Sequence, residues 1–170
     1  MMGSAALLCV LSLLEAVAGI ALHDGNIRTA VEEWLSDSAA AEATYGHIST
    51  WDTSGVTDMA YLFSACDWHY RCNSAAASFN EDIGAWDTSG VTSMTKTFYR
   101  ASAFNQDLGE WAVHGITTVK GMQQMFYGAS AFDQDLGWCF DDGVKMSSAF
   151  YGTPCESTSC GVQQNAAGTC

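Results

Sequence analysis

Three aspartates at equivalent positions of a repeated motif are the first residues whose spacing suggests chemistry. Asp82, Asp107 and Asp135 each stand in a Phe-x-x-Asp-x-Gly segment: FNEDIG, FNQDLG and FDQDLG. If the repeats stack, these carboxylates form a ladder along one edge, and calcium prefers such oxygen ligands. The same side chains can instead hydrogen-bond to the backbone of their own turns, and we favour this role for the ladder and its neighbours Asn80, Asn105 and Asp133. The sequence therefore predicts no cofactor, with calcium as the alternative.

A second group of potential ligands lies in a short stretch that interrupts the repeats. Cys66, His69 and Cys72 are spaced closely enough to bind zinc, but the sequence offers no evident fourth ligand. A disulfide between the two cysteines, across five intervening residues, is the interpretation that we favour.

The residues between those cysteines are the best candidates for binding. Trp68, His69, Tyr70 and Arg71 would stand at the tip of a cross-linked loop, and aromatic residues and arginine dominate the energetics of interfaces. The alternative is a loop that folds back on the amino-terminal part of the chain. Both interpretations stay open at this stage.

Catalysis and nucleic-acid binding find little support in the composition. None of the four histidines (His23, His47, His69 and His114) lies in a recognisable nucleophile, phosphate or metalloprotease motif, so we expect a protein that is not an enzyme. The net charge of −13, with only six Lys and Arg, argues against nucleic acid or an anionic membrane surface as a partner. Cations, basic ligands or a saline exterior fit this acidity better. The partner that we expect is a protein or glycan ligand.

These residues are positioned by an internal repeat. WDTSGVTDM at residues 51–59 returns as WDTSGVTSM at 86–94 and decays to WAVHGITTV at 111–119. Trp86 and Trp111 are 25 residues apart and Trp111 and Trp138 are 27 apart, whereas Trp51 precedes Trp86 by 35 because residues 66–77 are inserted. A period in the twenties predicts a solenoid, in which the insertion is an outer loop.

Apolar residues within one unit predict its local structure. Val91, Met94, Phe98 and Ala101 recur at gaps of three, four and three, which predicts one face of a short helix that starts near Thr92. The following stretch up to Trp111 is compatible with a brief strand or an extended turn. We therefore expect an α/β solenoid, a short right-handed stack of strand-turn-helix units.

Both ends of such a stack need a cover. An amphipathic helix over residues 26–35, followed by a second short helix over 36–45, would cap the amino end. Four cysteines near the carboxyl end would cap the other; of the three possible pairings we lean to Cys139 with Cys155 and Cys160 with Cys170. The six cysteines outside the first 18 residues favour disulfides and export.

The amino terminus is apolar from Ala5 to Ala18 and ends in small residues. We interpret residues 1–18 as a secretory signal peptide, although no Lys or Arg precedes the apolar run. The alternative is a buried or membrane-anchoring helix. The run is shorter than the roughly 20 residues that span a bilayer.

Two of the units carry a family resemblance. WDTSGVTSMTKTFYRASAFNQDLG (86–109) and GMQQMFYGASAFDQDLG (121–137) closely resemble the surface-protein repeat first described in mycoplasma lipoproteins, grouped with the BspA-like leucine-rich-repeat surface proteins. The resemblance covers residues 48–151, and the segment 27–45 resembles the lead-in to such arrays. It implies a repeat solenoid on a secreted or cell-surface protein that acts in adhesion or ligand recognition, without catalytic residues. The insertion at 66–77 and the decay at 111–118 depart from the pattern.

Together these patterns predict a signal peptide (1–18), an amino-terminal helical cap (19–47), a repeat solenoid of about 3.5 units (48–151) and a cysteine-rich carboxyl-terminal cap (152–170). The predicted function is non-catalytic recognition or adhesion at the cell surface. The alternative is a calcium-stabilised structural element of an extracellular matrix, and a secreted hydrolase is a distant third.

Overall fold

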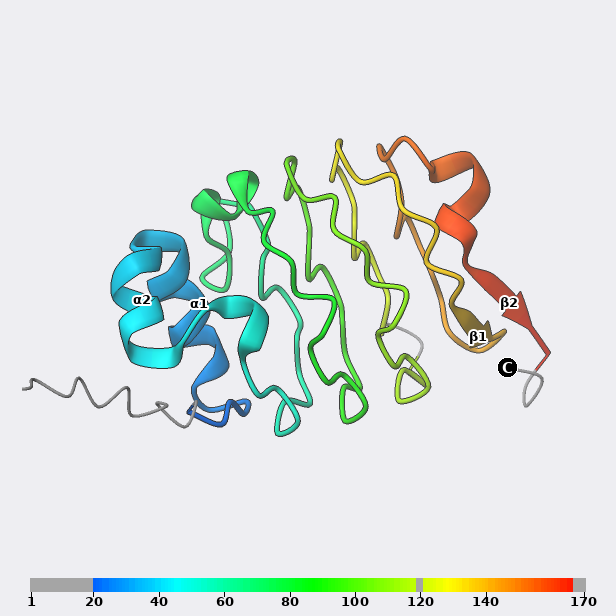
Figure 1. Cartoon of the computed structure of the whole chain (residues 1–170). Coiled ribbons are helices and arrows are strands. Elements are labelled where there is room, and N and C mark those ends of the chain that lie inside the picture. The colour runs from blue at the N-terminus through cyan, green and yellow to red at the C-terminus, as the bar shows by residue number, and fades with distance from the viewer. Residues whose placement is uncertain (1–19, 119–120, 167–170) are drawn as a thin grey trace, which may run out of the picture.

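Successive repeats of the chain lie side by side as coils between two differently built ends. The structure is a computed structural model that describes residues 20–118 and 121–166. Two helices, α1 (Ile27–Ser36) and α2 (Ser38–Tyr45), lie at one end, and two short strands, β1 (Cys139–Asp141) and β2 (Gln163–Asn165), lie at the other (Figure 1). Three short 3₁₀ helices complete the described elements: η1 (Ile48–Thr50), η2 (Ser74–Ser78) and η3 (Glu156–Gly161). The predicted signal peptide, residues 1–18, lies outside the described residues.

The amino-terminal cap consists of the two predicted helices. The buried face of α1 includes Ile27, Val31 and Trp34, at the spacing that predicted it. Asp37 separates the helices and caps α2, because its side chain accepts a hydrogen bond from the backbone N–H of Ala40. The Trp34 ring packs edge-on against Trp51 at 5.9 Å between centroids, so α1 covers the first repeat. Both predicted helices are confirmed.

Consecutive turns replace the helix predicted within each unit. From Met94 to Arg100, alternate N–H groups donate to the next repeat, and the others close turns three residues back within their own repeat. The partners in the next repeat are carbonyls at 2.7–3.0 Å: Met94 to Gly121, Lys96 to Gln123, Phe98 to Met125 and Arg100 to Tyr127. The prediction of a one- or two-turn helix per unit is therefore wrong. The stretch before Trp111 contains no strand, which leaves the extended turn of the two alternatives. Pairing between repeats uses N–H groups that a helix would keep for itself.

These turns require an unusual backbone at one repeated position. The second residue after the methionine of each unit has a left-handed backbone: Tyr61, Lys96, Gln124 and Ser148, with φ from 52° to 64°. None of the four is glycine, and a left-handed backbone costs an ordinary residue roughly 1–2 kcal/mol. In the first three of these units, a hydrogen bond from the N–H of this residue to the next repeat holds the conformation.

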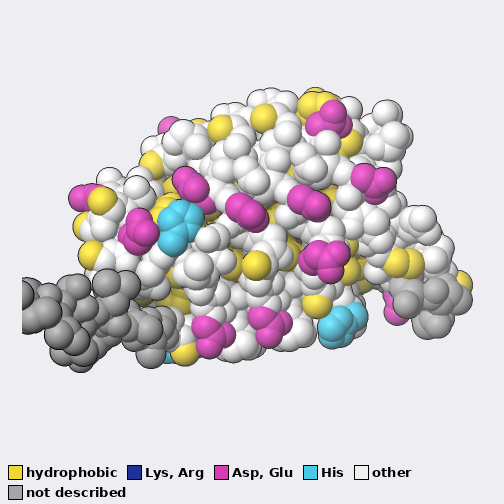
Figure 2. Space-filling view, viewed as in Figure 1, with side chains coloured by type: hydrophobic (Ala, Val, Ile, Leu, Met, Phe, Trp, Pro, Cys, Tyr) yellow, Lys and Arg dark blue, Asp and Glu magenta, His cyan; other side chains and the backbone are white. Residues whose placement is uncertain are grey.

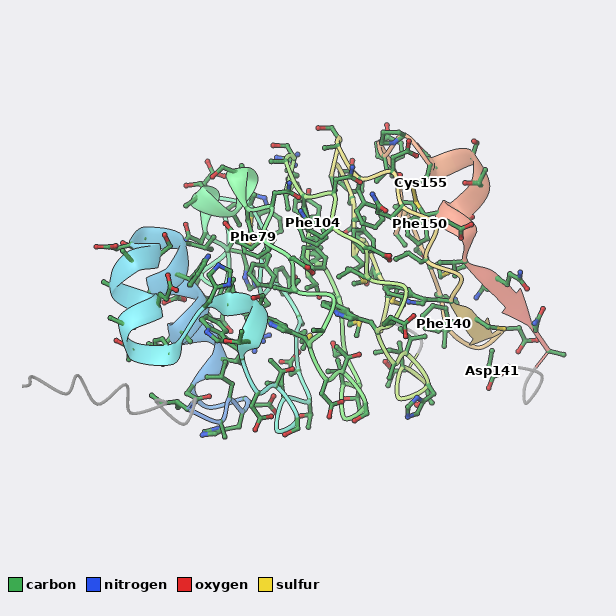
Figure 3. All side chains as sticks on the ribbon, in the orientation of Figure 1. Phe79, Phe104, Phe140, Asp141, Phe150 and Cys155 are labelled. Atoms are coloured by element: carbon green, nitrogen blue, oxygen red, sulfur yellow. A yellow bond between two sulfur atoms is a disulfide. The ribbon has the colours of Figure 1, made fainter. Side chains whose placement is uncertain are left out.

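The core of the coils is made of aromatic columns. Phenylalanine rings stack from repeat to repeat at centroid distances of 5.3–6.0 Å, and the two columns face each other at 4.1–4.2 Å. Figure 3 labels Phe79, Phe104 and Phe150 of these columns. The members are Phe63, Phe98, Phe126 and Phe150 in one column and Phe79, Phe104 and Phe132 in the other.

Buried tryptophans add polar contacts to this core. Each repeat tryptophan donates its indole N–H to a backbone carbonyl of an earlier coil, at 2.8–3.1 Å: Trp51 to Gly46, Trp86 to Ile48, Trp111 to Ile83 and Trp138 to Leu108. Because an unpaired indole N–H in the core would be costly, these bonds explain how so large a side chain is buried in each unit. They also fix each coil relative to its neighbour.

The carboxyl end is closed by β1, β2 and a disulfide inside η3. The strands pair in parallel, with Cys139 opposite Gln163. Cys155 is bonded to Cys160. Cys139 is disulfide-bonded too. The predicted pairs Cys139 with Cys155 and Cys160 with Cys170 are therefore wrong.

The reason for this error is local. η3 turns sharply, with positive φ at Ser159 and Cys160, and this brings the Cα atoms of Cys155 and Cys160 to 4.8 Å. Sequence spacing cannot show such a turn. The carboxyl end is still cross-linked, as expected, but by a local bridge.

The described residues include no helix long and apolar enough to cross a membrane. The solenoid class and its right-handedness stay predictions.

Candidate functional site

The inserted loop displays two aromatic rings on a cross-linked base. Cys66 and Cys72 form a disulfide, with Cα atoms 5.1 Å apart, as predicted. Both sulfur atoms are consumed in this bond, so they are not thiolate ligands for zinc. Between them Trp68 is 55% exposed and Tyr70 is 88% exposed. The loop therefore presents apolar surface to solvent without being free to collapse.

The other two predicted tip residues support the loop. The His69 ring stacks between Tyr61, at 4.5 Å, and Tyr70, at 4.7 Å. Arg71 lies 3.3 Å from the carboxylate of Asp58, which also holds Arg28 of α1 at 3.2 Å. His69 and Arg71 thus hold the loop against the first repeat and the cap.

Two guanidinium groups share one carboxylate, so positive charge exceeds negative charge within this group of three side chains. Burial and the neighbouring charge of Arg71 lower the pKa of Arg28, and Asp58 opposes this shift. Arg28 also donates to the carbonyl of Ala60 at 2.7 Å. The loop is therefore tied to α1 on one side, as the folded-back interpretation expected, while its aromatic residues stay exposed.

A lysine joins the loop to the following repeat. The Lys96 ammonium lies over the rings of Trp68 at 4.8 Å, and of Tyr61 and Tyr99 at 5.3 Å each. Trp68 also packs edge-on against Tyr99 at 6.1 Å. Such cation–π contacts favour a fixed position for both partners.

Tyr99 begins a column of tyrosines that sequence reasoning missed. Tyr99, Tyr127 and Tyr151 stack at centroid distances of 5.2 and 4.9 Å. Tyr99 is 8% exposed, Tyr127 is half-buried and Tyr151 is 54% exposed. The signal was in the sequence, since each unit carries a Phe-Tyr pair at residues 98–99, 126–127 and 150–151. We call Trp68, Tyr70, Tyr99, Tyr127 and Tyr151 the aromatic strip.

Charge is distributed unevenly around the molecule. Figure 2 shows a face with many Asp and Glu side chains on which no Lys or Arg is visible. Lys96 and Arg100 lie elsewhere, beside the strip, where the Arg100 guanidinium is 5.3 Å from the Tyr99 ring centre. Neither forms an ion pair within the described residues. Among the described residues, the strip thus has two cations without an ion pair beside it, and Lys145 is a third that lies elsewhere.

The aspartate ladder serves its own turns. Asp82, Asp107 and Asp135 each accept a hydrogen bond at Oδ1 from the N–H of the glycine two residues on, at 2.9–3.2 Å. Beside it, Asn80 accepts from the N–H of Asn105, and Asn105 accepts from that of Asp133. Across residues 20–118 and 121–166, no three His, Cys, Asp or Glu side chains are grouped so as to hold a metal ion. Turn stabilisation is therefore the role that these contacts support.

The turn that opens each unit uses the same chemistry. Hydrogen bonds from the side chain and backbone N–H of Ser54 lower the pKa of Asp52, and those of Ser89 lower the pKa of Asp87.

Calcium should leave the stability of the chain unchanged. We expect the melting temperature of the oxidised protein to move by less than about 1 °C between calcium and a chelator, because a ligand stabilises only what it binds. Differential scanning calorimetry measures this. A rise of several degrees that Asp107→Asn abolishes would contradict the turn assignment and restore the calcium alternative.

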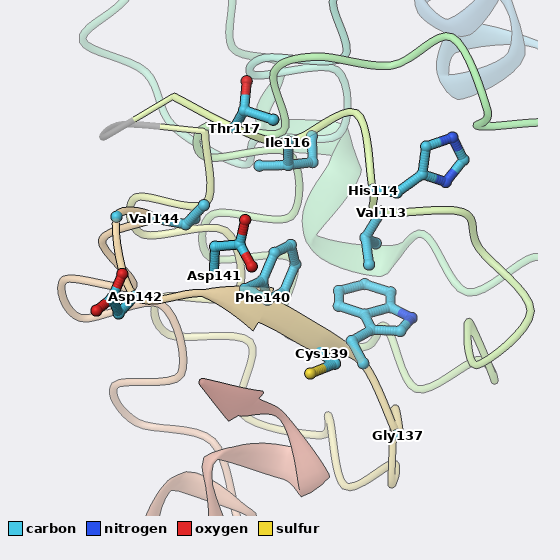
Figure 4. Close-up of a pocket in the computed structure, with 12 residues that line it drawn as sticks. Val113, His114, Ile116, Thr117, Gly137, Cys139, Phe140, Asp141, Asp142 and Val144 are labelled. Carbon is cyan, nitrogen blue, oxygen red and sulfur yellow. The ribbon is translucent and has the colours of Figure 1, made fainter. Parts of the chain in front are cut away.

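A cavity lies at the other end of the molecule. It has a volume of about 610 Å³, with apolar walls from Val113, Trp138, Phe140 and Val144 and polar groups that include His114 (Figure 4). Its wall ends at Thr117, close in sequence to residues 119 and 120, which lie outside the described part. We base no proposal on it.

Comparison with known proteins identifies the family. The family model described as "Mycoplasma protein of unknown function, DUF285" matches residues 32–160, and the chain belongs to this family. No curated protein and no solved structure gives a match. The family supports the mycoplasma-type repeat resemblance in its coarse form. Disulfides form and persist in oxidising compartments, so the pairs described above indicate an extracellular environment.

Proposed function

We propose that this protein is a secreted or cell-surface repeat protein that binds a ligand without catalysis, with the aromatic strip as its recognition surface. The observation that supports this most strongly is the exposure of Trp68 and Tyr70 on a cross-linked loop. Exposed apolar side chains that are gathered on one surface mark interaction sites. Aromatic residues and arginine are also the side chains that contribute most to binding.

The inserted loop is also held rigidly by its neighbours. His69 stacks beneath Tyr70, Lys96 lies over Trp68, and Arg71 is paired with Asp58. A loop held in this way loses little conformational entropy when it binds, so more of the contact energy appears as affinity.

For the scaffold we propose a BspA-like, leucine-rich-repeat-like solenoid. In support, backbone hydrogen bonds run from Phe63 to Thr97, from Phe98 to Met125 and from Phe126 to Ala149, that is, through each successive coil. A repeat that contacts mainly its neighbours is typical of solenoids. The inserted loop then lies at one edge of a stack, where it extends the row of tyrosines.

A binding array tests the proposed function. The oxidised chain is applied to immobilised fibronectin, laminin, type I collagen, mucin, chitin and hyaluronan, beside the double variant Trp68→Ala/Tyr70→Ala. We expect at least one ligand to bind, and the double variant to weaken that binding about tenfold or more, equivalent to at least about 1.4 kcal/mol. Far-ultraviolet circular dichroism and melting verify that the variant is folded.

The matched control is Ile20→Ala, which removes another exposed apolar side chain, 42% exposed, outside the strip. It should bind like the unmodified protein. Failure to bind any ligand on the array, or equal binding by the double variant, would overturn the proposal.

A further inference from the structure

We propose that the aromatic strip binds an anionic carbohydrate, a chain of pyranose rings that carry carboxylates. This inference rests on the proposed function and names the chemical class of its ligand. The strip offers three properties that such a ligand needs: open ring faces, a repeating row of hydroxyl groups and unpaired cations.

The open ring faces are at Tyr70, Trp68 and Tyr151. Tyr70 is covered by His69 on one face and is 88% exposed; Tyr151 stacks on Tyr127 and is 54% exposed. The face of an aromatic ring carries partial negative charge, and the C–H groups on one side of a pyranose ring are weakly positive and apolar. A sugar ring can therefore stack on each of these faces.

The tyrosine column provides the repetition. Tyr99, Tyr127 and Tyr151 follow one another at 5.2 and 4.9 Å, so their phenolic groups recur once per coil. A phenolic hydroxyl both donates and accepts hydrogen bonds, as sugar hydroxyls do. Exposure rises along the column, from 8% at Tyr99 to 54% at Tyr151, so a polymer of similar rings meets these contacts mainly at the later coils.

The aromatic strip offers a peptide few of the contacts that peptides usually use. Peptides usually add a strand to a free backbone edge or insert side chains into pockets. Behind the strip, the N–H groups of Lys96 and Arg100 are already bonded to Gln123 and Tyr127 of the next coil. The tyrosine column lines neither the 610 Å³ cavity nor a second one of about 390 Å³, which Tyr70 lines together with Asp24 and Glu32. The backbone there is closed, and what remains accessible is aromatic rings, hydroxyl groups and charge.

The positive charges beside the strip favour an anionic ligand. Lys96 and Arg100 lie beside Tyr99 without an ion pair in the described residues, whereas Arg28 and Arg71 share Asp58. Arg100 has φ 57° at a position where the next two units have Gly128 and Gly152, with φ 71° and 77°. The backbone at this position therefore suits glycine and does not itself require an arginine.

Titration calorimetry with defined oligosaccharides tests the inference. Hyaluronan and oligogalacturonate hexamers supply carboxylates, a chitin hexamer is a neutral sugar, and hexaglutamate is an acidic peptide. We expect at least one uronate hexamer to bind about tenfold or more tightly than chitin and hexaglutamate, and high salt to weaken it.

The variants are chosen so that the chain still folds. Arg100→Gly places glycine where the backbone favours it, and Tyr151→Ala alters an exposed ring; each should weaken uronate binding about fivefold or more. Lys145→Gln, which removes an exposed lysine outside the strip, should leave uronate binding unchanged.

Each other result overturns the inference in a distinguishable way. Equal binding of hexaglutamate would assign an acidic peptide, and equal binding of chitin would remove the role of charge. If neither uronate hexamer binds while an array ligand still depends on Trp68 and Tyr70, the carbohydrate inference fails and the proposed function stands. If the array shows no ligand as well, both fail.

Discussion

We expect Phe98→Ala to lower the free energy of unfolding by about 3–5 kcal/mol, the usual cost of removing a buried phenylalanine ring. Phe98 is fully buried and stacks on Phe63, Phe104 and Phe126, at 5.5, 4.1 and 5.3 Å between centroids. Its loss opens a cavity at a point where both phenylalanine columns meet. Because neighbouring repeats share these contacts, the damage should extend to the adjacent coils.

Urea unfolding of the oxidised protein measures this effect. The control is Phe98→Leu, which retains most of the apolar volume and should cost clearly less. A loss below about 1 kcal/mol for Phe98→Ala would show that the columns are not the packed core described here.

The second large effect is expected at a glycine that lets two coils approach closely. A Cβ atom added to Gly115 would lie 2.5 Å from the carbonyl oxygen of Val91 in the preceding repeat. The backbone must shift to admit it, so Gly115→Ala should destabilise the fold by about 1–3 kcal/mol, as overpacking commonly does.

The repeat itself provides the matched control. Gly90 holds the equivalent position one unit earlier, but an added Cβ would lie 3.5 Å from the carbonyl oxygen of Val56, an ordinary contact. Gly90→Ala should therefore be tolerated in the same urea experiment. Equal effects at the two sites would mean that glycine is present for its backbone freedom and not for the spacing of the coils.

The ends of the fold were easier to predict than its coils. Ile27, Val31 and Trp34 have the helical spacing that α1 shows, and the two cysteines of the inserted loop are too close in sequence to suggest another pairing. By contrast, Val91, Met94 and Phe98 also have helical spacing, yet the segment pairs with its neighbours as a series of turns. The spacing of these apolar residues reflects only which side chains are buried. The same spacing occurs in a helix and in a compact coil.

The left-handed backbone could not be predicted, because residue type gives no sign of it. Tyr61, Lys96, Gln124 and Ser148 share this conformation but no side-chain property. At the first three of these positions, a hydrogen bond to the next coil holds it. The same reason explains the cysteine error, since the turn at Ser159 and Cys160 depends on backbone that spacing does not reveal.

The candidate site was predicted in part. Trp68 and Tyr70 are exposed as expected, whereas His69 and Arg71 turned out to support the loop. The tyrosine column was missed because an aromatic residue after a core phenylalanine suggests more core. Its outward position follows from the turn geometry, which places successive side chains on different sides of the coil.

A single contact tests most directly whether the loop and the tyrosine column form one surface. In the oxidised protein, we expect nuclear Overhauser effects between the ε-methylene protons of Lys96 and the indole protons of Trp68, since the ammonium lies 4.8 Å from the ring centre. Ring currents should also shift the Lys96 resonances upfield. Lys96 resonances at their unfolded values, with no such effects, would contradict a continuous aromatic strip and the recognition surface proposed from it.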